Sequence, residues 1–260
     1  MASPIILEVR NLSVPPFVRG EVSFTLREGE RLGVYGHSGS GKTALLRALL
    51  GAIPCRGEVI WHVPRARVGY AAQRARLIPR ATVFRQILWC AQLHEVSLSP
   101  HGSRVHELLE QWRLQERRQE PVHRLSAGEQ ARLELCCAMA IAPRLLVVDG
   151  LLEVLDEPGR EAFWEEVDAR CARREMALIL ATHSPREAEM TDRVLLLHEG
   201  RMLALDTPEH LRNLATGEQV RLHSVQARLK RGGEEVHLAL QRLPSVEDAL
   251  RTLLRQEGML

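Results

Sequence analysis

The chain has 260 residues, of which 45% are hydrophobic and 26% charged, a balance typical of a globular protein rather than a disordered one. Its 35 basic and 33 acidic residues give a formal net charge of +2, which is too close to neutral to indicate a nucleic-acid partner. Arginine supplies 33 of the basic residues, and Lys42 and Lys230 are the two lysines. Guanidinium and ammonium groups are not interchangeable, so a lysine retained in such a chain points to a task that Arg cannot perform.

The five cysteines are odd in number and include no CxxC pair, which argues against a disulfide framework and a zinc site. They favour a reducing, cytoplasmic setting. Glu8 and Arg10 lie where a signal peptide would need an unbroken apolar core. The longest apolar run, residues 135–143, is about half the length of a membrane-spanning helix. We therefore expect any membrane association to run through a partner protein.

The first third of the chain predicts short strands at residues 5–10, 22–26 and 31–35, separated by turn residues. Helical spacing of apolar residues then predicts a helix over 42–50. A strand–turn–helix unit is therefore centred on residues 36–43.

Residues 82–142 have apolar positions that repeat every three or four residues, which predicts a helical insert. After the insert, the chain predicts a strand at 145–149, a helix at about 159–175, a strand at 177–182 and a hairpin that turns near 199–200. Continuous apolar strands that alternate with helices indicate a buried parallel sheet in an α/β fold.

Beyond about residue 215 the pattern weakens to one strand-like alternation and a short helix that starts at Val246. We therefore expect residues 216–260 to form a small C-terminal accessory segment. Lys230 falls in this segment, and the sequence assigns it no role.

The predicted strand-to-helix turn matches the Walker A pattern GxxxxGK[ST] with Gly36, His37, Ser38, Gly39, Ser40, Gly41, Lys42 and Thr43. In this motif, backbone N–H groups turn around phosphate oxygens, and the following helix presents its positive N-terminal end. Lys42 would reach the β- and γ-phosphates, and Thr43 would give a hydroxyl to Mg²⁺. The alternative, an ordinary Gly/Ser-rich turn, leaves the retained lysine unexplained. We predict a site for ATP and Mg²⁺.

The apolar strand at 145–149 ends in Asp149 and fits the Walker B motif, whose aspartate helps to hold Mg²⁺ at the carboxyl edge of the sheet. Apolar strands that end in Asp are common, so the assignment rests on its pairing with the Walker A stretch.

Between these motifs lies Leu125-Ser126-Ala127-Gly128-Glu129-Gln130, which resembles the LSGGQ signature of ABC-transporter ATP-binding subunits. Ala replaces the first Gly of the signature, and Glu replaces its Gln. The resemblance covers about residues 5–215 and continues in the family's order: Gln73 matches the Q-loop, residues 155–156 the end of the D-loop, and His183 the switch histidine. Alone, His183 could equally be an ordinary histidine at a strand end.

The resemblance implies a P-loop NTPase fold with a RecA-like parallel sheet core, an N-terminal antiparallel β subdomain and an inserted helical signature subdomain at about 74–140. The ATP-binding domain would span residues 1–215. Gln73, Asp149 and His183 would serve catalysis, and Thr43, Gln73 and Asp149 would hold the metal.

The resemblance also implies that two ATP-binding subunits enclose two ATP molecules, with each site joining the Walker motifs of one chain to the signature of the other. Ser126, Ala127, Gly128 and Glu129 would contact the nucleotide of the second chain. A membrane permease subunit would be the other partner, with this chain peripheral on the inner face of the cell membrane.

Four short segments look like those of ABC-2 type exporter subunits: residues 187–189, 192–194, 205–208 and 243–248. The resemblance therefore implies export. The alternative for the acidic residues at 187–189 is a solvated helix face. A non-transport ABC-type ATPase and a non-hydrolysing, ATP-gated module are competing functions.

The sequence departs from the family directly after Walker B, where Gly150 replaces the Glu that polarises the attacking water. General-base catalysis contributes about 10²–10⁴ in rate, so we expect this site to bind ATP and to hydrolyse it slowly. Glu153 is a possible substitute, but a shifted backbone position rarely preserves the reach of a base. These features favour a heterodimer with a second, complete ATP-binding subunit, and a homodimer is the alternative.

The aromatic residue that stacks on adenine in the family has one candidate here, Phe17, in the stretch Val14-Pro15-Pro16-Phe17. The two prolines could direct Phe17 elsewhere, so stacking stays a hypothesis.

Overall fold

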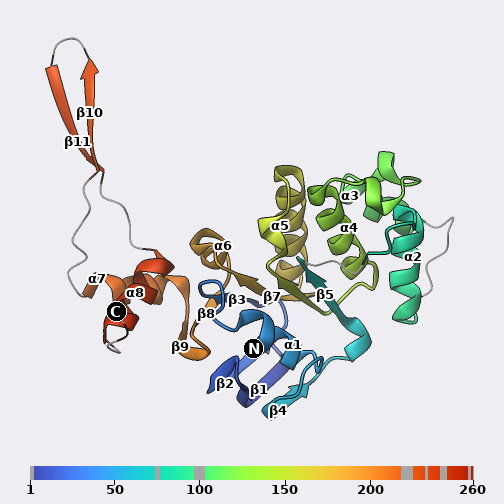
Figure 1. The fold of residues 1–260 in the computed structure, drawn as a ribbon, viewed down its shortest axis with the longest axis horizontal. Helices are drawn as coiled ribbons and strands as arrows, with labels where there is room; N and C mark the ends of the chain where they lie inside the picture. Colours follow the sequence, from blue (N-terminus) through green and yellow to red (C-terminus); the bar gives the residue numbers. More distant parts are fainter. Residues whose placement is uncertain are drawn as a thin grey trace.

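The structure is a computed structural model that describes residues 3–73, 77–96, 103–217, 225–231, 234–240, 245–256 and 259. Its centre is a six-stranded sheet in the order β5-β6-β7-β3-β8-β9 (Figure 1). The strands are β3 (Arg31–Tyr35), β5 (Val68–Ala72), β6 (Leu145–Asp149), β7 (Ala177–Thr182), β8 (Arg193–His198) and β9 (Arg201–Asp206). The first five strands of this order run parallel, and β9 pairs antiparallel with β8. The predicted α/β fold with a parallel core is confirmed.

Four strands of this sheet end in register at its carboxyl edge. Ala72 pairs with Asp149, and Asp149 pairs with Ala181 on the next strand. Tyr35 pairs with Thr182. Every residue of β6 and β7 is buried, as expected for a parallel sheet covered on both faces. The segments that follow β3, β5, β6 and β7 therefore meet at one edge, where α/β sheets bind their ligands.

A three-stranded antiparallel sheet covers one face of the core and consists of β1 (Ile5–Val14), β2 (Val18–Arg27) and β4 (Arg56–Trp61) in the order β2-β1-β4. Buried and exposed residues alternate along the second half of β2, with Val22, Phe24 and Leu26 inside. They pack with α1 (Lys42–Leu49) and the central sheet in one hydrophobic cluster. This is the predicted N-terminal antiparallel subdomain.

Helices cover the opposite face and extend into the inserted subdomain (Figure 1). They are α2 (Val83–Leu93), α3 (Ser103–Gln111), α4 (Ala127–Ala140) and α5 (Glu157–Ala172). Trp112, Leu133 and Phe163 belong to the core that joins these helices to the sheet. The predicted helical subdomain at 74–140 includes residues 74–76 and 97–102, which lie outside the described part of the chain.

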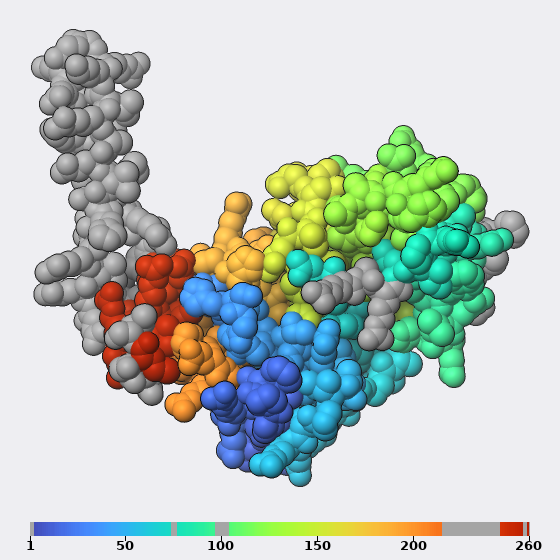
Figure 2. All heavy atoms as spheres, in the orientation of Figure 1, coloured from blue at the N-terminus to red at the C-terminus, as the bar shows by residue number. Residues whose placement is uncertain are grey.

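The remaining elements are α6 (Pro185–Glu189), α7 (Pro208–Gly217), β10 (Val225–Arg231), β11 (Glu234–Leu240) and α8 (Val246–Gln256). Leu250 and Leu254 of α8 are buried in a cluster that includes Tyr35 and Leu196 of the central sheet. Figure 2 shows α8, in red, against the body of the domain beside the orange segment that includes β9. The boundary predicted at residues 215 and 216 falls inside α7. Within the described residues, no helix combines the length and the apolar character needed to cross a bilayer.

Candidate functional site

The glycine-rich turn between β3 and α1 has the conformation of a phosphate loop. Gly39 and Gly41 adopt φ angles of +82° and +102°, which L side chains rarely adopt. Helix α1 begins directly after Gly41 with no side-chain cap and no acidic residue in its first turn. Its first N–H groups therefore lack a side-chain acceptor, and they favour an anion. A Cβ on Gly39 would meet nothing within 4 Å, so that side of the loop is open.

Two side chains of the loop fit the same ligand. Lys42 Nζ donates to the carbonyl oxygens of Gly36 at 2.6 Å and His37 at 2.9 Å, which places the ammonium group over the loop. Burial lowers the pKa of Lys42, and the carboxylates of Glu153 and Asp149 act to raise it. Ser40 is 4% exposed, and its Oγ has no partner among the described residues. A compact ammonium, a buried hydroxyl and uncapped helix N–H groups suit a phosphate chain.

Oxygen ligands for a cation converge beside the loop. Thr43 Oγ1 donates to Asp149 Oδ1 at 2.9 Å, and the Gln73 N–H donates to the Asp149 carbonyl oxygen at 3.1 Å. The described residues hold no cluster of three His, Cys, Asp or Glu side chains that could bind a metal by itself. Mg²⁺ at this place would therefore take phosphate oxygens and water besides Thr43, Asp149 and Gln73, as Mg²⁺ sites commonly do.

Tyr70 is a member of this site that sequence reasoning missed. Its hydroxyl donates to Asp149 Oδ2 at 3.1 Å, so both oxygens of the Walker B carboxylate have a partner. Burial, together with the charge of Asp149, raises the pKa of Tyr70 to about 12 and keeps the hydroxyl a donor. The available signal was weak, because an aromatic residue in a strand normally indicates packing.

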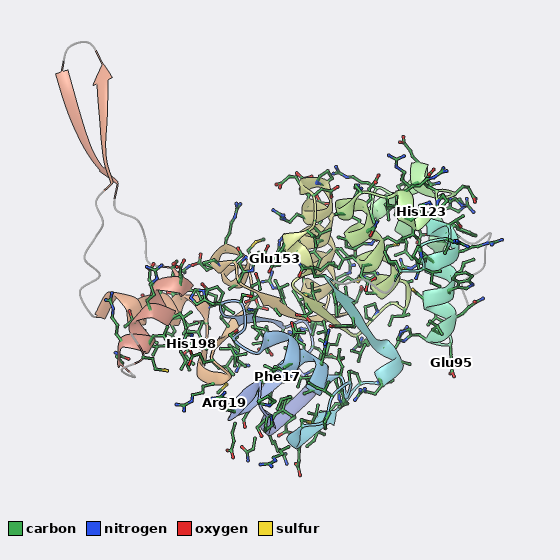
Figure 3. The ribbon with its side chains drawn as sticks, in the orientation of Figure 1. Phe17, Arg19, Glu95, His123, Glu153 and His198 are labelled. Carbon is green, nitrogen blue, oxygen red and sulfur yellow. The ribbon has the colours of Figure 1, made fainter. Side chains whose placement is uncertain are left out.

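The structure brings His183 and Glu153 together beside Gly150. His183 directly follows β7, and its Nδ1 lies 2.5 Å from Glu153 Oε1. The 3₁₀ turn Leu151–Glu153 brings the Glu153 side chain to this edge, with Oε1 3.8 Å from a Cβ on Gly150. The expectation that Glu153 does not replace a base at position 150 stays a prediction. Figure 3 labels Glu153 between α5 and α6.

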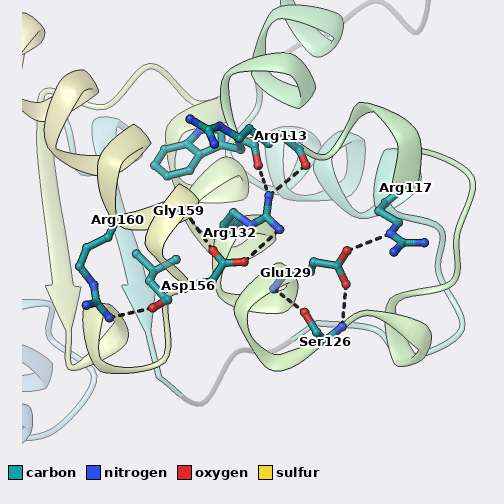
Figure 4. A network of polar contacts seen from close by, with 10 residues as sticks. Arg113, Arg117, Ser126, Glu129, Arg132, Asp156, Gly159 and Arg160 are labelled. Carbon is teal, nitrogen blue, oxygen red and sulfur yellow. Dashed lines mark hydrogen bonds and ion pairs between the residues drawn. The ribbon is translucent and has the colours of Figure 1, made fainter.

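The signature residues begin helix α4 and form a capping box. The Glu129 N–H donates to Ser126 Oγ at 3.2 Å, and the Ser126 N–H donates to Glu129 Oε2 at 2.8 Å (Figure 4). Arg117 holds the other Glu129 oxygen at 2.8 Å. Burial acts to raise the pKa of Glu129, but the Ser126 and Arg117 contacts outweigh it and lower the pKa. Glu in place of the family's Gln therefore adds a negative charge to the first turn, which also contains Ala127 and Gly128.

The signature helix is tied to the D-loop by a salt bridge that the sequence did not predict. Arg132 Nη2 lies 3.1 Å from Asp156 Oδ2, and Arg132 Nη1 also donates to the Trp112 and Arg113 carbonyls (Figure 4). A Cβ on Gly128 would come within 3.0 Å of Asp156, so the small residue in the signature permits this close approach. The signature thus contacts the D-loop within its own chain, whereas the Walker motifs contact each other.

Phe17 lies in the turn between β1 and β2, beside the phosphate loop. Its carbonyl oxygen would lie 2.8 Å from a Cβ on Gly41 and 2.3 Å from one on Gly200, so the backbone packs closely on both glycines. The ring is 59% exposed, and Figure 3 labels it close to α1. The position suits a base bound next to the phosphates, and stacking on adenine stays a hypothesis.

Comparisons with known proteins agree with this geometry. Residues 20–153 match the ABC transporter family model. A spermidine/putrescine import ATP-binding protein of Thermotoga maritima is 33% identical over 72% of this chain and 54% of its own length. An energy-coupling factor transporter ATP-binding protein of Oceanobacillus iheyensis is 30% identical over 79% of this chain and 80% of its own. The chain spans about half the length of the spermidine/putrescine relatives that it matches.

Solved structures agree on the fold. An ATP-binding subunit of an ABC transporter superposes with a TM-score of 0.74 at 24% identity and covers 80% of this chain and 92% of its own. The relatives named above are import and energy-coupling factor proteins, so they lend no support to the expected exporter type. Both the matched family and the arrangement of the Walker motifs lead to one assignment: the chain belongs to the ABC transporter family and contains its ATP-binding domain.

Proposed function

We propose that this chain is the ATP-binding subunit of an ABC transporter and couples the binding and hydrolysis of ATP to transport through a separate permease. The observation that carries the proposal is the Lys42 ammonium over the phosphate loop, next to the Thr43–Asp149 pair. Relatives named as import ATP-binding proteins support the same role. The chain would then act in the cytoplasm, peripheral on the inner face of the cell membrane.

The site as built favours ATP binding over fast hydrolysis. Gly150 supplies no carboxylate after Walker B, and a missing general base costs about 10²–10⁴ in rate. We therefore infer a slow site here. A heterodimer with a second, complete ATP-binding subunit follows from this inference, because that subunit's Walker motifs would face Ser126 and Gly128 of this chain.

The test is reconstitution. The chain would be co-expressed with the membrane protein that purifies with it, and the complex would be inserted into lipid vesicles. We expect ATP-dependent solute movement that stops when Lys42→Ala and its equivalent in a second subunit are combined. Movement that is independent of ATP, or a chain that binds no Mg-ATP, would contradict the proposal.

The direction of transport is a separate question for the same vesicles. The ABC-2 type resemblance favours export, whereas the named relatives are import proteins. Solute that leaves the side on which ATP is added supports an exporter, and solute that accumulates on that side supports an importer.

A second candidate function, a non-hydrolysing module that ATP gates, is favoured by Gly150 alone. It predicts normal Mg-ATP affinity with no phosphate release by the full complex over many binding lifetimes. Phosphate release above that of the Lys42→Ala complex excludes it.

A further inference from the structure

The Tyr70 side chain reaches the Walker B carboxylate along the surface of the central sheet. Strand β5 pairs in parallel with β6, so that Tyr70 lies opposite Val147 and Ala72 lies opposite Asp149. Residues two apart on a strand share a face, as do residues paired across strands, so Tyr70 and Asp149 lie on the same face of the sheet. Because Ala72 is small, the longer Tyr70 side chain can extend along the strand, and its hydroxyl lies 3.1 Å from Asp149 Oδ2.

This face of the sheet is the one against which α1 packs. Tyr70 and Val147 belong to the hydrophobic cluster that contains the buried leucines of α1, the helix that begins after Gly41. Asp149 is 8% exposed and also accepts the Thr43 hydroxyl at 2.9 Å. Tyr70 and Thr43 therefore approach one buried carboxylate from two elements, an edge strand of the sheet and the first turn of a helix.

The two contacts fix the orientation of the Asp149 carboxylate. An ionised carboxylate can only accept hydrogen bonds, so Thr43 and Tyr70 are the donors. Each carboxylate oxygen is held by one of them, and the group cannot rotate without breaking a hydrogen bond. A carboxylate has about four acceptor positions, so these two contacts leave positions for Mg²⁺ or for water bound to it.

The ring and the hydroxyl of Tyr70 have separable roles. The ring packs in the apolar cluster, and a Phe at this position would supply the same packing. The hydroxyl adds the contact with Asp149, the residue expected to help hold the metal. Removal of a donor from a buried carboxylate is costly, because the oxygen that loses its partner is shielded from water.

We propose that Tyr70 is a positioning residue of the metal site, whose hydroxyl holds the Asp149 carboxylate in the orientation in which Asp149 and Thr43 together bind Mg²⁺. The inference rests on the proposed function, because Mg²⁺ is expected here as the partner of bound ATP. Tyr70 acts through Asp149 and needs no contact of its own with the nucleotide.

The test separates metal-dependent from metal-independent binding of ATP by the full chain. ATP affinity is measured at equilibrium in excess Mg²⁺ and again in EDTA, for the wild type and for Tyr70→Phe. We expect Tyr70→Phe to weaken ATP binding about tenfold in Mg²⁺ and by less than about twofold in EDTA. The Mg²⁺ concentration that gives half of the tight binding should rise as well, because metal binding and nucleotide binding are linked. A substitution that only disturbed the domain would lower both affinities.

Tyr35→Phe is the matched control, because Tyr35 is the other tyrosine of the chain. It ends β3 in the same sheet, but it packs in the cluster formed with α8. The Tyr35→Phe variant loses the same hydroxyl group and should leave both affinities unchanged.

A double-mutant cycle tests the route of the effect. In the Asp149→Ala background there is no carboxylate to hold, so Tyr70→Phe should weaken Mg-ATP binding no further.

The role of Tyr70 is overturned if Tyr70→Phe binds ATP in Mg²⁺ as tightly as the wild type does, or if its affinity falls equally in Mg²⁺ and in EDTA. It is also overturned if Tyr70→Phe weakens Mg-ATP binding in the Asp149→Ala background, or if Tyr35→Phe shows the same metal-dependent loss.

Failure of the proposed function gives a different result. If Lys42→Ala binds Mg-ATP as tightly as the wild type does, the ATP site itself is wrong. If Lys42→Ala loses binding and Tyr70→Phe keeps wild-type affinity in Mg²⁺, the ATP site stands and only the role of Tyr70 is wrong.

Discussion

At the scale of single residues, Lys42 shows why this chain keeps a lysine among its arginines. Its ammonium group sits over two loop carbonyls at 2.6 and 2.9 Å. A guanidinium is planar and broader, and its donors point in fixed directions, so it does not fit the same short contacts. Lys42→Arg keeps the charge and tests the geometry alone.

We expect Lys42→Arg to weaken Mg-ATP binding at least about tenfold, with the thermal unfolding midpoint unchanged. Equilibrium titration of the purified chain measures this. Lys230→Arg serves as the control for a lysine outside the site. Wild-type affinity in Lys42→Arg would mean that the phosphate contact needs charge but no particular shape.

Gly150 gives a second prediction at this scale. A Glu at this position would keep a φ near +65°, which costs about 1–2 kcal/mol for an L residue, yet its side chain would enter open space. Gly150→Glu should raise ATP turnover by more than about tenfold, because it supplies the carboxylate that position 150 lacks. Gly150→Gln has the same shape and strain, so an equal rise in Gly150→Gln would contradict the missing-base explanation.

The sequence allowed the prediction of residues whose role is set by local spacing, and it was less informative about contacts between distant segments. The Walker A loop follows from eight consecutive residues, and Asp149 follows from its strand. The contact of Tyr70 with Asp149 and that of Glu153 with His183 depend on how strands pack side by side and on one short turn. No periodic pattern in the sequence predicts these contacts between side chains of distant segments.

At the scale of elements, helix α4 connects the signature to the rest of the domain. Its first turn is capped by Ser126 and Glu129, and further along the helix Arg132 contacts Asp156. The Arg132 side chain is 10% exposed, so loss of its partner would leave a nearly buried charge. Asp156 also caps α5, because its Oδ1 accepts from the Gly159 N–H at 3.1 Å.

Two substitutions at Asp156 separate these roles. Asp156→Asn keeps a capping oxygen and removes the charge, and we expect it to lower the free energy of unfolding by about 2 kcal/mol. Asp156→Ala should cost about 1 kcal/mol more, the usual value of a lost N-cap. Urea denaturation measures both. Equal stability of Asp156→Asn and the wild type would show that the salt bridge is not stabilising.

Helix α4 also carries Glu134, a largely buried acid next to β5. Burial, with the nearby Cys90, raises its pKa to about 7, although a hydrogen bond with the Ala72 backbone acts to lower it. Because the pKa of Glu134 is raised in the folded state, protonated Glu134 stabilises the fold fully below pH 4.5, the usual pKa of a Glu side chain. This stabilisation is lost as the pH rises toward 7. The loss is at most about 1.4 kcal/mol per pH unit in this window.

Glu134→Gln should remove this part of the pH dependence. Near pH 4 we expect the variant to be no more stable than the wild type. Near pH 8 we expect it to be more stable, because an amide can fill the same position without charge. Denaturant midpoints across this range measure the difference. If the difference in stability between the variant and the wild type is the same at every pH, ionisation of Glu134 does not oppose folding.

At the scale of the whole molecule, the described structure places the Walker motifs and the signature in two different regions. The Walker motifs, Gln73 and His183 lie at the carboxyl edge of the central sheet, whereas the signature lies on the helical subdomain and contacts the D-loop. This division is what a site shared between two chains requires, since each chain would contribute a different part. The order of the motifs along the chain was enough to predict this division. The packing of α8 against Tyr35 and β8 could not be predicted, because the apolar pattern of the sequence beyond residue 215 is weak.

The division leads to a prediction for the complex with a second ATP-binding subunit. If that subunit holds the fast site, then its nucleotide faces Ser126 of this chain, and Lys42 serves the slow site. Ser126→Ala should therefore lower steady-state ATP turnover of the complex far more than Lys42→Ala does, by about tenfold or more. In the same complex, Lys42→Ala should remove one of two bound nucleotides at equilibrium.

Loss of the Ser126 hydroxyl also removes an N-cap worth about 1 kcal/mol, so the cap must be controlled separately. Thr82 caps α2 in the same way, because its Oγ1 accepts from the Arg85 N–H at 3.3 Å. Thr82→Ala should therefore leave turnover intact while it lowers stability by a similar amount. If Lys42→Ala proves the more damaging substitution, the fast site belongs to this chain, and the heterodimer with a slow site at Gly150 is wrong.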